Sequence, residues 1–475
     1  MSNSNITQLE EQKEIKKSGF NKTTLYWIIS IALPILLLSL PTSAQFTSQI
    51  KLFFALSLGG ILFWAFEIVP NFIVSLILPV LYLIFNLAPA DVVFSSWSNY
   101  IPWIMLSGMI LTNVAEETGL LKRVAYWSIL KTGGSYRGII YGLTLSGVII
   151  ALVMTDLTAR TILFATLSYG ICKALDLENG GKASSGIMLA GLFAALNPGY
   201  IFLTSTSQTM IAYQAAEKFG VSGSWTSYLF HNGLITLIWC FISALILDLL
   251  FKSERHIKSK EIFQEEKSKL GKISLREKKM IVIFALIIIA ILTEQYHKVQ
   301  VGWIFTLAAG AIFLPGIDLG KSQSAKNLNF SIVVFVTATL TIGAVASKVG
   351  AGKFIAELLL PIMSGSKLYT LTSVWVFGVL IKFLMTPLAA VATLSEPIVR
   401  FAQSAGINPI PVLYVWNQSL EQVILPYEYA LVLLTLSYGY LSLKNLMKAF
   451  SLKMLFNIIF ILVIAVPFWK LIGIF

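Results

Sequence analysis

The chain consists of long apolar runs separated by short polar links, a pattern that predicts helices crossing a membrane rather than a soluble core. Uninterrupted runs predict spans near residues 25–40, 52–69, 72–87, 101–115, 229–251, 281–293, 301–314, 332–346 and 454–469. Two further runs, near 186–213 and 412–435, carry polar residues in their middle and predict broken spans. Together these segments predict an all-α polytopic membrane protein with about 11 transmembrane spans.

A different interruption occurs between Gly147 and Thr166, where Asp156 and Arg160 lie at the centre of an otherwise apolar run. A charge at the centre of a membrane costs roughly 3 kcal/mol on insertion scales, so both side chains should face protein or water rather than lipid. The surrounding segment, about 138–174, is too long for one span. Because irregular backbone at membrane depth is tolerated only against protein or a water-filled cavity, we expect a re-entrant hairpin here.

The same pattern returns in the second half of the chain, from Gly378 to Pro397. One constant offset pairs Gly119 with Gly350, Ser135 with Ser366, Gly147 with Gly378, Met154 with Met385, and Thr155 with Thr386. An ungapped match over this length indicates an internal repeat, with a second hairpin near 368–401. Because the first repeat begins outside the membrane and the second begins inside, we expect two inverted repeats, each with a re-entrant hairpin and an interrupted helix.

The predicted organisation has five parts. Residues 1–24 form a cytoplasmic tail, 25–49 a first span and outer loop, 50–251 repeat 1, 252–280 a cytoplasmic basic loop, and 281–475 repeat 2. Basic residues mark the cytoplasmic side of membrane proteins. With the amino terminus inside the cell, most Lys and Arg fall on that side, and the carboxyl terminus lies outside the plasma membrane.

Composition supports the membrane prediction and narrows the functional class. Of the 475 residues, 56% are hydrophobic and 12% are charged, whereas soluble domains are nearer a quarter charged. A net charge of +12 could suggest nucleic-acid binding, but the basic residues lie in short loops between apolar runs, which argues against it. Cys172, Cys240, His231, His256 and His297 show no metal spacing, and no catalytic motif has a suitable context. We therefore expect no enzyme and no organic cofactor.

Four motifs, in order along the chain, carry a family resemblance. Trp64-Ala-Phe-Glu67-Ile-Val-Pro70 resembles W-x-x-E-x-[IV]-P, and Gly119-Leu-Leu-Lys122-Arg123-Val-Ala resembles G-L-x-[KR]-R-[IV]-A. Leu270-Gly271 through Glu277-Lys278 resembles L-G-x-[MIL]-S-x-x-E-[KR], and Gly302-Trp303 through Leu314-Pro315-Gly316 resembles an eighth span. All four are similar to the divalent anion/sodium symporter (DASS) family. The resemblance covers nearly the whole chain and implies a homodimeric carrier of di- or tricarboxylates with elevator-type alternating access.

The chain departs from this family at the motifs that carry its chemistry. Family members usually have Ser-Asn-Thr at each hairpin tip, where this chain has Asp156-Leu157-Thr158 and, by the repeat offset, Pro387-Leu388-Ala389. The family's Thr-Pro-Pro-Asn corresponds here to Thr206-Ser207-Gln208-Thr209 and to Pro426-Tyr427-Glu428-Tyr429. The resemblance implies that Thr158, Leu388, Ala389, Pro426 and Tyr427 contact the substrate and that sodium binds near Asp156 and Pro387.

The charged tip near Asp156 leaves two roles open for each side chain. Asp156 is either the N-cap of a half-helix or a carboxylate that binds a proton or sodium, and the two roles are compatible. Arg160 either neutralises Asp156 or binds a substrate carboxylate with its guanidinium. Thr158 either donates to an anion or bonds its own helix backbone. Thr155 and Thr386, at the two tips, are further candidates for contact with a coupling ion.

The broken spans supply the remaining candidates. Six consecutive hydroxyl or amide residues, 204–209, include Thr206, Ser207, Gln208 and Thr209. Beside the free N–H groups of a half-helix, such residues suit an anionic solute, and ordinary interhelical hydrogen bonding is the alternative. Three acids are unexpected in a carrier of anions: Glu396, Glu421 and Glu428. They could pair with Lys382 or Arg400, hold a proton, or bind a coupling cation.

Three functions are therefore open. The first is a secondary active transporter, a symporter or exchanger, that moves a small organic anion with sodium or protons. The second is a proton-linked carrier of a cationic, zwitterionic or amino-acid-like solute on the same scaffold, bound by Asp156 and the three glutamates. The third is a membrane protein that keeps the fold without transport. The expected partners are a small-molecule anion, the lipid bilayer and a second copy of the chain.

Overall fold

The computed structural model describes residues 22–475 apart from 67, 221–223, 253–259, 327 and 384–385. Every regular element in this part of the chain is a helix, and no strand occurs in it. The all-α prediction is therefore confirmed. Glu67, His256, Met385 and most of the predicted tail fall outside the described residues, so what was expected of them stays a prediction.

The first half of the chain contains long helices and several short turns. Its helices are α2 (Lys22–Ser39), α3 (Ser48–Ala65), α4 (Asn71–Ile84), α5 (Ala90–Val93), η1 (Ser95–Ser98), α6 (Tyr100–Glu117), α7 (Leu120–Lys131), α8 (Tyr136–Ala151), α9 (Leu157–Ala174), α10 (Lys182–Leu196), η2 (Asn197–Tyr200), α11 (Ser207–Glu217), α12 (Trp225–Tyr228), η3 (Leu229–Gly233) and α13 (Leu234–Leu250).

The second half follows a similar order after the surface helix α14 (Lys260–Lys269). Its helices are α15 (Leu275–Leu292), α16 (Glu294–His297), α17 (Val301–Ala311), α18 (Ser322–Lys326), α19 (Phe330–Val349), α20 (Ala351–Met363), α21 (Lys367–Ile381), α22 (Pro387–Ser404), α23 (Pro409–Ser419), η4 (Pro426–Glu428), α24 (Ala430–Leu436), α25 (Leu443–Phe460), η5 (Ile461–Ala465) and α26 (Val466–Leu471).

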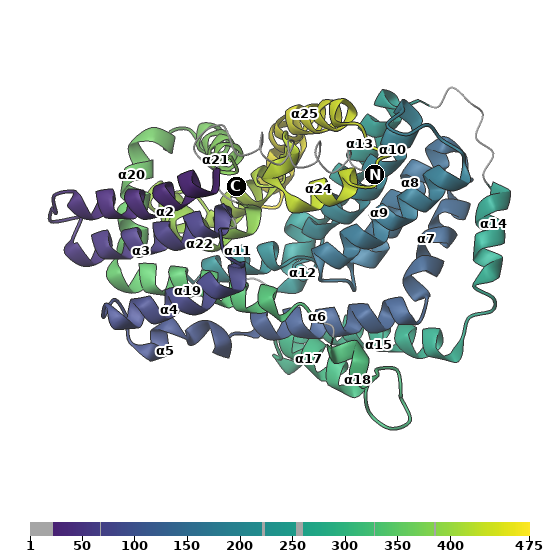
Figure 1. Ribbon diagram of the computed structural model, residues 1–475, viewed down its shortest axis with the longest axis horizontal. Coiled ribbons are helices and arrows are strands. Elements are labelled where there is room, and N and C mark those ends of the chain that lie inside the picture. The colour runs from purple at the N-terminus through teal and green to yellow at the C-terminus, as the bar shows by residue number, and fades with distance from the viewer. Residues whose placement is uncertain (1–21, 67, 221–223, 253–259, 327, 384–385) are drawn as a thin grey trace, which may run out of the picture.

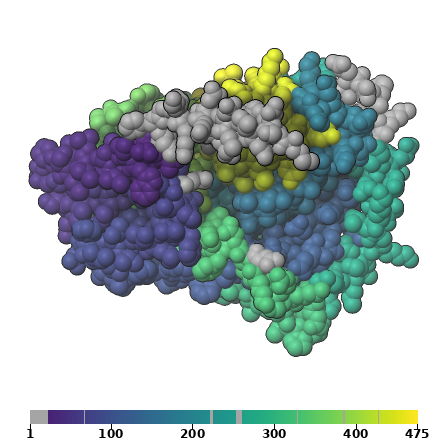
Figure 2. Space-filling model, in the orientation of Figure 1, coloured from purple at the N-terminus to yellow at the C-terminus, as the bar shows by residue number. Residues whose placement is uncertain are grey.

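The molecule is elongated, with different helices at its two ends (Figure 1). Helices α2 to α5 gather at one end, and α7 and α14 lie at the other, while α6 and α15 run along one long side. Figure 2 shows the same division on the surface, with the N-terminal helices at one end and α14 at the opposite edge. The helices that carry the polar interruptions, α8 to α11 and α21 to α24, lie between these ends.

Several helices are long and apolar enough to cross a membrane. Within the described residues four helical stretches meet this standard by length and composition: Ser48–Ala65, Trp225–Leu250, Phe330–Val349 and Leu443–Leu471. Shorter apolar helices include α4, α8, α17 and α21. Large apolar side chains remain exposed on α2 and α4, as expected where helices face lipid. The membrane class is supported, whereas the number of spans and their orientation stay predictions.

Four interruptions organise the centre of the molecule, and we name them by their position. Tip 1 (residues 152–156) separates α8 from α9, and tip 2 (residues 382–386, of which 382, 383 and 386 are described) separates α21 from α22. Break 1 (residues 197–206) separates α10 from α11, and break 2 (residues 420–429) separates α23 from α24. Each helix end lies within a few residues of the polar interruption that predicted it.

Side-chain caps explain why the helices begin where they do. The Ser135 hydroxyl accepts a hydrogen bond from the Gly138 amide at the start of α8, and Ser366 does the same for Tyr369 at the start of α21. Gly119 and Gly350 both have φ +82° and are the N-caps that immediately precede α7 and α20. A left-handed backbone favours glycine, which lacks a Cβ. These pairs keep the offset found in the sequence.

The offset changes by one residue at the tips. Asp156 is the N-cap of α9 and Thr386 is the N-cap of α22, so Asp156 rather than Thr155 corresponds to Thr386. The reason is that α8 has 16 residues and α21 has 15, whereas α9 and α22 both have 18. The ungapped pairing of Thr155 with Thr386 is therefore not the structural one.

The two halves pack into each other rather than side by side. Helix α4 of the first half packs on α19 of the second, and α17 of the second half packs on α6 of the first. In the same way, α9 packs on α24 and α22 packs on α11. Each helix after a tip therefore contacts a helix after the break of the other half, which brings the four interruptions into one region.

Candidate functional site

Arg160 joins tip 1 to break 1 and is fully buried. Its Nε donates to the Ala195 carbonyl at 2.7 Å, and its Nη1 donates to the carbonyls of Met154 at 3.1 Å and Ser205 at 3.4 Å. Its Nη2 has no hydrogen-bond partner among the described residues. A Cβ on Gly199 would lie 2.8 Å from this Nη2, so a glycine at this position leaves room for the guanidinium.

Asp156 performs the capping role that the sequence allowed. One carboxylate oxygen accepts hydrogen bonds from the amides of Thr158 at 2.8 Å and Ala159 at 3.2 Å. No ion pair within 4 Å joins Asp156 to Arg160, although both are described, so the predicted neutralisation of one by the other is not found. The reason is that Arg160 points to backbone carbonyls of α10 and break 1 instead. The Asp156 carboxylate is half-buried.

The other threonines of tip 1 differ in their surroundings. Thr155 is buried against α6, where a Cβ on Gly108 would lie 1.8 Å from its hydroxyl oxygen. This glycine therefore lets the tip sit directly against α6. Thr158, in the first turn of α9, is half-buried, and its hydroxyl has no hydrogen-bond partner within the described part of the chain.

Most of the polar side chains of break 1 are satisfied locally. Thr206 caps α11 by accepting from the Thr209 amide at 3.3 Å, and Thr209 donates to the Leu203 carbonyl at 2.9 Å. The Tyr200 hydroxyl donates to Gln208 Oε1 at 2.8 Å. These hydrogen bonds lie within break 1 and α11 and are local rather than interhelical, and substrate contact by Thr206, Gln208 and Thr209 stays a prediction. Ser207, at the first position of α11, is half-buried.

Break 2 contains two buried glutamates, and each has a buried lysine within 4 Å. Glu428 Oε2 lies 3.8 Å from Lys382 Nζ, which belongs to tip 2. Glu421 Oε2 lies 3.5 Å from Lys453 Nζ on α25. The pairing of Glu428 with Lys382 is one that the sequence allowed, whereas Lys453 was not considered.

The remaining predicted contacts lie around tip 2 and break 2. Leu388 is half-buried and Ala389 is buried in the first turn of α22, where the Ala389 amide donates to the Thr386 hydroxyl at 3.4 Å. Pro426 is half-buried in η4. The side chain of Tyr427 falls outside the description, so its predicted contact stays a prediction.

Glu396 is the predicted coupling residue that the structure does not bring to a tip. It lies ten residues after Thr386 on α22, about 15 Å along the helix. Its carboxylate is 3.3 Å from Arg400 and 3.9 Å from Lys218 of the loop after α11. Glu396 is close to tip 2 in the sequence, but the rise of the helix separates the two in space.

The two breaks face each other through tyrosines that the sequence analysis did not single out. Tyr200 of break 1 lies close to Glu421 of break 2, and Tyr429 of break 2 lies close to Gln208 of α11. Several other buried polar atoms in this region have no hydrogen-bond partner among the described residues: Asn197 Oδ1, Lys382 Nζ, Asn417 Oδ1, Gln418 Nε2, Glu421 Oε1, Gln422 Oε1 and Glu428 Oε2. Buried polar groups usually require a partner, so their concentration here marks a candidate binding region.

The three buried cations of this region have two buried acids beside them, and the third acid of the region, Asp156, is half-buried. Arg160, Lys382 and Lys453 are cations, and Glu421 and Glu428 are the acids that the two lysines accompany. One positive charge, that of Arg160, therefore has no acid within 4 Å in the described structure. A guanidinium offers planar paired donors that match a carboxylate.

Lys453, Tyr200 and Tyr429 are the site residues that sequence reasoning missed. Lys453 is a fully buried charged residue at the start of a strongly apolar stretch. A lysine inside a membrane helix is itself an indication of function, and that observation could have selected it. The tyrosines carry no comparable signal, because tyrosine is common at membrane interfaces and in helix cores.

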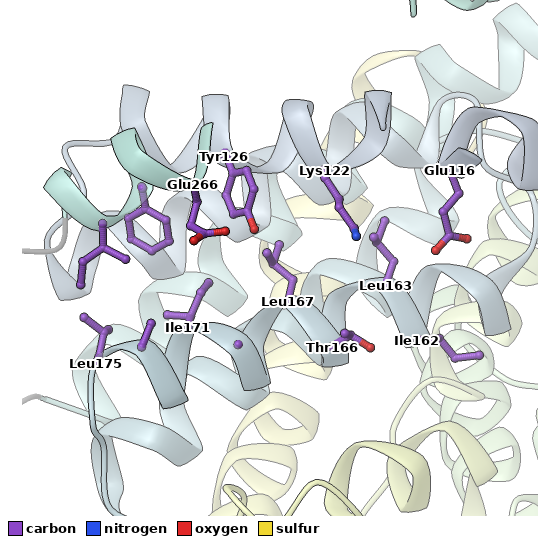
Figure 3. Close-up of a pocket in the computed structure, with 14 residues that line it drawn as sticks. Glu116, Lys122, Tyr126, Ile162, Leu163, Thr166, Leu167, Ile171, Leu175 and Glu266 are labelled. Carbon is purple, nitrogen blue, oxygen red and sulfur yellow. The ribbon is translucent and has the colours of Figure 1, made fainter. Parts of the chain in front are cut away.

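A separate crevice lies beside α9, away from the two breaks. It has a volume of about 360 Å³ and lies between α9, α14 and the segment around α7. Figure 3 shows Glu116, Lys122, Tyr126 and Glu266 facing the side chains of Ile162, Leu163, Thr166, Leu167 and Ile171 on α9. Because its lining is mainly apolar and includes no tip or break residue, we do not treat this crevice as the binding site.

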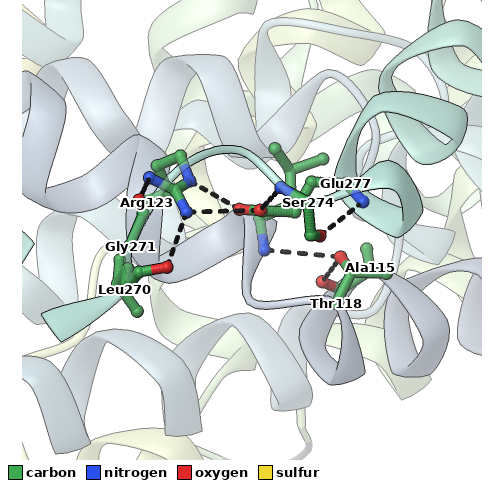
Figure 4. Close-up of polar contacts among 8 residues, drawn as sticks. Ala115, Thr118, Arg123, Leu270, Gly271, Ser274 and Glu277 are labelled. Carbon is green, nitrogen blue, oxygen red and sulfur yellow. Dashed lines mark hydrogen bonds and ion pairs between the residues drawn. The ribbon is translucent and has the colours of Figure 1, made fainter.

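Two motifs that were far apart in the sequence meet near α7. Arg123 Nη2 donates to Glu277 Oε2 at 3.2 Å, and Arg123 also donates to the carbonyls of Leu270 and Gly271 at 3.1 and 3.0 Å (Figure 4). Ser274 and Glu277 form a capping box that begins α15. The second and third family motifs are therefore one structural unit that holds the segment between the two halves against α7.

Metal chemistry receives no support from the described residues. No group of three or more His, Cys, Asp or Glu side chains among them could hold a metal ion. Cys172 and Cys240 are free and buried. The His297 ring contacts the Ala290 carbonyl at 2.7 Å on the surface, and the His231 carbonyl accepts from Trp469 Nε1.

Comparisons with known proteins identify relatives that are named as transporters. The chloroplastic dicarboxylate transporter 2.1 of Arabidopsis thaliana is 29% identical over 171 residues, 34% of this chain and 30% of the relative. The chloroplastic dicarboxylate transporter 2 of Spinacia oleracea is 25% identical over 258 residues, 50% of this chain and 43% of the relative. The chain thus spans less than half the length of these two relatives.

A third relative aligns over more of its length. The sodium-dependent dicarboxylate transporter SdcS of Staphylococcus saprophyticus subsp. saprophyticus is 24% identical over 394 residues, 76% of this chain and 74% of the relative. These relatives are named as transporters, and none of the three is named as an enzyme. A family model described as the sodium:sulfate symporter transmembrane region matches residues 21–475. The chain therefore belongs to the sodium:sulfate symporter family, the family of divalent anion/sodium symporters that its motifs resemble.

Proposed function

We propose that this protein is a secondary active transporter for a small organic dianion, a di- or tricarboxylate, which binds between tip 1 and the two breaks. The observation that carries the proposal is the buried guanidinium of Arg160, which has a free Nη2 and no acid within 4 Å among the described residues. A buried cation without an ion-pair partner is costly, and Glu421 and Asp156 act on Arg160 only from beyond 4 Å. A bound anion removes that cost, which supports an anionic solute.

Helix N-termini around the same region favour the same class of solute. Helices α9, α11 and α22 begin at tip 1, break 1 and tip 2, and helix N-termini attract anions through free N–H groups and the helix dipole. The residues that we propose for substrate contact are Thr158, Arg160, Thr206, Ser207, Gln208, Thr209, Leu388, Ala389, Pro426 and Tyr427. Ser207 and Thr158 are the half-buried hydroxyls nearest to α11 and α9 N-termini.

The pairing of the acids in this region supports an anionic rather than a cationic solute. Glu421 and Glu428 each have a lysine within 4 Å, and Glu396 lies beside Arg400 and Lys218. A cationic or amino-acid-like solute needs an acid that is free to bind it. Asp156 is the remaining candidate acid, and one of its oxygens is already used as a cap.

We propose that a coupling ion, sodium or a proton, acts at tip 1 through Asp156 and the neighbouring Thr155. The names of the family and of one relative both mention sodium. Half-helix ends and unwound carbonyls are where such carriers bind coupling ions. Thr386, Glu396, Glu421 and Glu428 complete the set of coupling-ion candidates, and tip 2 is treated separately below.

The packing of the helices supports alternating access by an elevator-type movement. The helices next to the tips and breaks contact one another across the two halves, as do α4 with α19 and α17 with α6. Two inverted repeats with re-entrant hairpins explain this exchange, with tips and breaks forming the moving part. Thr155 against Gly108 is a contact between the proposed moving part and α6. A homodimer in the plasma membrane remains part of the proposal.

A ligand screen on the purified protein tests the proposed solute. Thermal unfolding is measured with succinate, malate, citrate, sulfate, amino acids and amines, each with sodium or choline as the cation. We expect the dicarboxylates to raise the Tm by roughly 3–6 °C at about 100 times Kd, because a bound ligand stabilises only the folded state. Stabilisation by amines alone would end the anion proposal, and no response to any solute favours a protein without transport.

A matched pair of variants locates the anion. Arg160→Lys keeps the charge but loses the planar fork, so the dicarboxylate-dependent rise in Tm and the uptake of labelled dicarboxylate should both disappear. Arg137→Lys, at the start of α8 and 66% exposed, is the control and should keep both. An unchanged response in Arg160→Lys removes Arg160 from the binding site.

A further inference from the structure

Lys382 occupies an unusual position at the end of a helix in the centre of the molecule. It is the C-cap of α21 and the first residue of tip 2, and its side chain is fully buried. The last carbonyls of a helix lack partners within the helix and carry partial negative charge, which favours a cation there. The acid nearest to it, Glu428, belongs to the turn η4 in break 2, so the pair connects tip 2 to break 2.

The Glu428 carboxylate is held in place by its other oxygen. Oε1 accepts hydrogen bonds from the amides of Leu425 at 2.7 Å and Ile424 at 3.2 Å. Two backbone donors suit an ionised carboxylate. Because the carboxylate is fixed by break 2 itself, its second oxygen, Oε2, presents a negative charge toward tip 2 at a defined position.

The contact between Lys382 and Glu428 compensates charge without forming a hydrogen bond. Nζ and Oε2 are 3.8 Å apart, beyond the usual hydrogen-bond range of about 2.7–3.2 Å. Neither atom has a hydrogen-bond partner in the described structure. The ammonium therefore acts here as a buried positive charge facing a fixed carboxylate.

The second buried pair, Lys453 with Glu421, is built differently. Lys453 Nζ lies 5.0 Å from the ring centre of Phe193 and 5.5 Å from that of Phe450, and it donates to Glu421 Oε2 at 3.5 Å. Aromatic faces attract cations, so Lys453 is enclosed by rings as well as by its acid. Lys382 has no cation–π contact in the described structure and lies on a tip, which makes it the lysine that stands where an ion could bind.

We propose that the Lys382 ammonium is a tethered cation that takes the place of a coupling ion at tip 2. The proposal rests on the proposed function. Carriers built from broken helices bind their coupling cation at half-helix C-terminal ends and unwound backbone, and Lys382 lies between such an end and the carboxylate of break 2. Sodium, a hard cation, takes oxygen ligands, whereas an ammonium brings three donors and no acceptor. The described part of tip 2 therefore offers a small cation a positive charge rather than ligands, and we place sodium coupling at tip 1.

Removal of the ammonium should create a sodium site where none existed. In Lys382→Ala, the Glu428 carboxylate loses its counter-charge and faces a space that a small cation can fill. We expect sodium chloride, compared with choline chloride at equal ionic strength, to raise the Tm of this variant by about 3 °C more than that of the wild type. The double variant Lys382→Ala/Glu428→Gln removes both charges and should respond to sodium as the wild type does.

A surface pair of the same type is the matched control. Lys353 Nζ lies 3.8 Å from Glu357 Oε1 on α20, with side chains 75% and 39% exposed. Lys353→Ala breaks a pair of equal length in water, and we expect its sodium response to equal that of the wild type. Comparing the sodium responses of Lys353→Ala and Lys382→Ala separates the effect of losing any lysine from that of losing a buried one.

The outcomes separate this inference from the proposed function. A folded Lys382→Ala with the wild-type sodium response overturns the inference. If that variant fails to fold, Lys382→Ser, which supplies a hydroxyl ligand, takes its place. If Lys382→Ala and Lys382→Ser both fail to fold in sodium chloride while the double variant folds, the inference is also overturned, because sodium then cannot replace the ammonium. The sodium response is read without a solute, so it can succeed or fail independently of the dicarboxylate screen.

Discussion

Tip 1 and tip 2 share a backbone plan but place their charge on opposite sides of the cap. At tip 1 the cation is Arg160, four residues after the cap Asp156, and it reaches back to carbonyls of α10 and break 1. At tip 2 the cation is Lys382, four residues before the cap Thr386, and it faces break 2. Both tips keep a capped start of the second helix, α9 or α22. The cation lies on the second helix at tip 1 but at the end of the first helix, α21, at tip 2.

The difference teaches that backbone geometry and charge are independent in the two halves. The caps and the glycines Gly147 and Gly378 preserve where each helix begins and how closely it packs. The cations decide what each tip can bind. Arg160 leaves one donor free among carbonyls, whereas Lys382 already faces a carboxylate. Tip 1 is therefore where we propose that an added anion binds, whereas tip 2 carries its own ion pair.

The largest expected effect comes from breaking the ion pair of tip 2 on its acid side. Glu428→Ala leaves Lys382 buried without a counter-charge and removes two hydrogen bonds that hold break 2. We expect a loss of about 4 kcal/mol in the free energy of unfolding. Glu357→Ala breaks the exposed pair of the same 3.8 Å length, and it should cost less than about 0.5 kcal/mol. Denaturant unfolding in detergent measures both, and equal losses contradict the role of burial.

The next effect tests the glycines that let the helix before each tip, α8 or α21, pack closely on the helix before a break, α10 or α23. A Cβ on Gly147 would lie 2.2 Å from the Ala194 carbonyl oxygen, whereas one on Gly378 would lie 1.8 Å from the Ser419 side-chain oxygen. A backbone carbonyl cannot withdraw, so Gly147→Ala should lose about 3 kcal/mol. Gly378→Ala should also lose stability, and Ser419→Gly should recover most of it. No substitution at Ala194 should restore the stability of Gly147→Ala, because every residue there keeps the carbonyl oxygen. A second substitution at Ala194 that restores stability would show that the clash is not with the backbone.

A third ion pair, outside both tips, gives a pH-dependent reference. Burial alone raises the pKa of Glu277, but hydrogen bonds from Arg123 and Ser274 outweigh it and hold that pKa below its usual value. A lowered folded pKa means that the stabilisation is present above the unfolded pKa of about 4.3 and is lost as the pH falls through the folded value. Arg123→Gln should cost about 2 kcal/mol near pH 7.

The control for this pair is the pH profile itself. Wild-type stability should fall below about pH 4 more steeply than that of Arg123→Gln, because the variant has already lost the contribution of the Glu277 carboxylate. Parallel profiles for the two proteins contradict the assigned cause. Arg276, at the start of α15 and 39% exposed, offers Arg276→Gln as the matched variant, which should keep the wild-type profile.

The sequence was sufficient for the membrane class and for the interrupted helices, because these depend on local pattern. Apolar runs broken at Asp156 and at Asn197-Pro198 mark real helix ends, and the family motifs are confirmed by the match over residues 21–475. The caps Ser135 and Ser366 also follow from local sequence, since a serine before an apolar run is typical of a helix start.

The contacts of the site depend on facts that sequence pattern does not contain. Arg160 binds backbone carbonyls, which every residue has, so no side-chain pattern could reveal its partners. Glu421 pairs with Lys453, 32 residues away on another helix. The structural pairing of Asp156 with Thr386 was hidden because an ungapped match cannot show that α21 is one residue shorter than α8.

The smallest effect separates capping from coupling at tip 1, which is the sharpest test of the difference between the tips. Asn caps helices as well as Asp does, so Asp156→Asn should change stability by only a few tenths of a kcal/mol, whereas Asp156→Ala should cost about 1 kcal/mol. Thr386→Ala removes the corresponding cap of tip 2 and should cost a similar amount. If Asp156 also binds the coupling ion, Asp156→Asn alters the ion dependence of uptake at nearly wild-type Tm, whereas Thr386→Ala lowers the Tm and leaves that dependence unchanged. Wild-type ion dependence in Asp156→Asn would leave Asp156 with its cap alone, and tip 1 would then differ from tip 2 only in the placement of its cation.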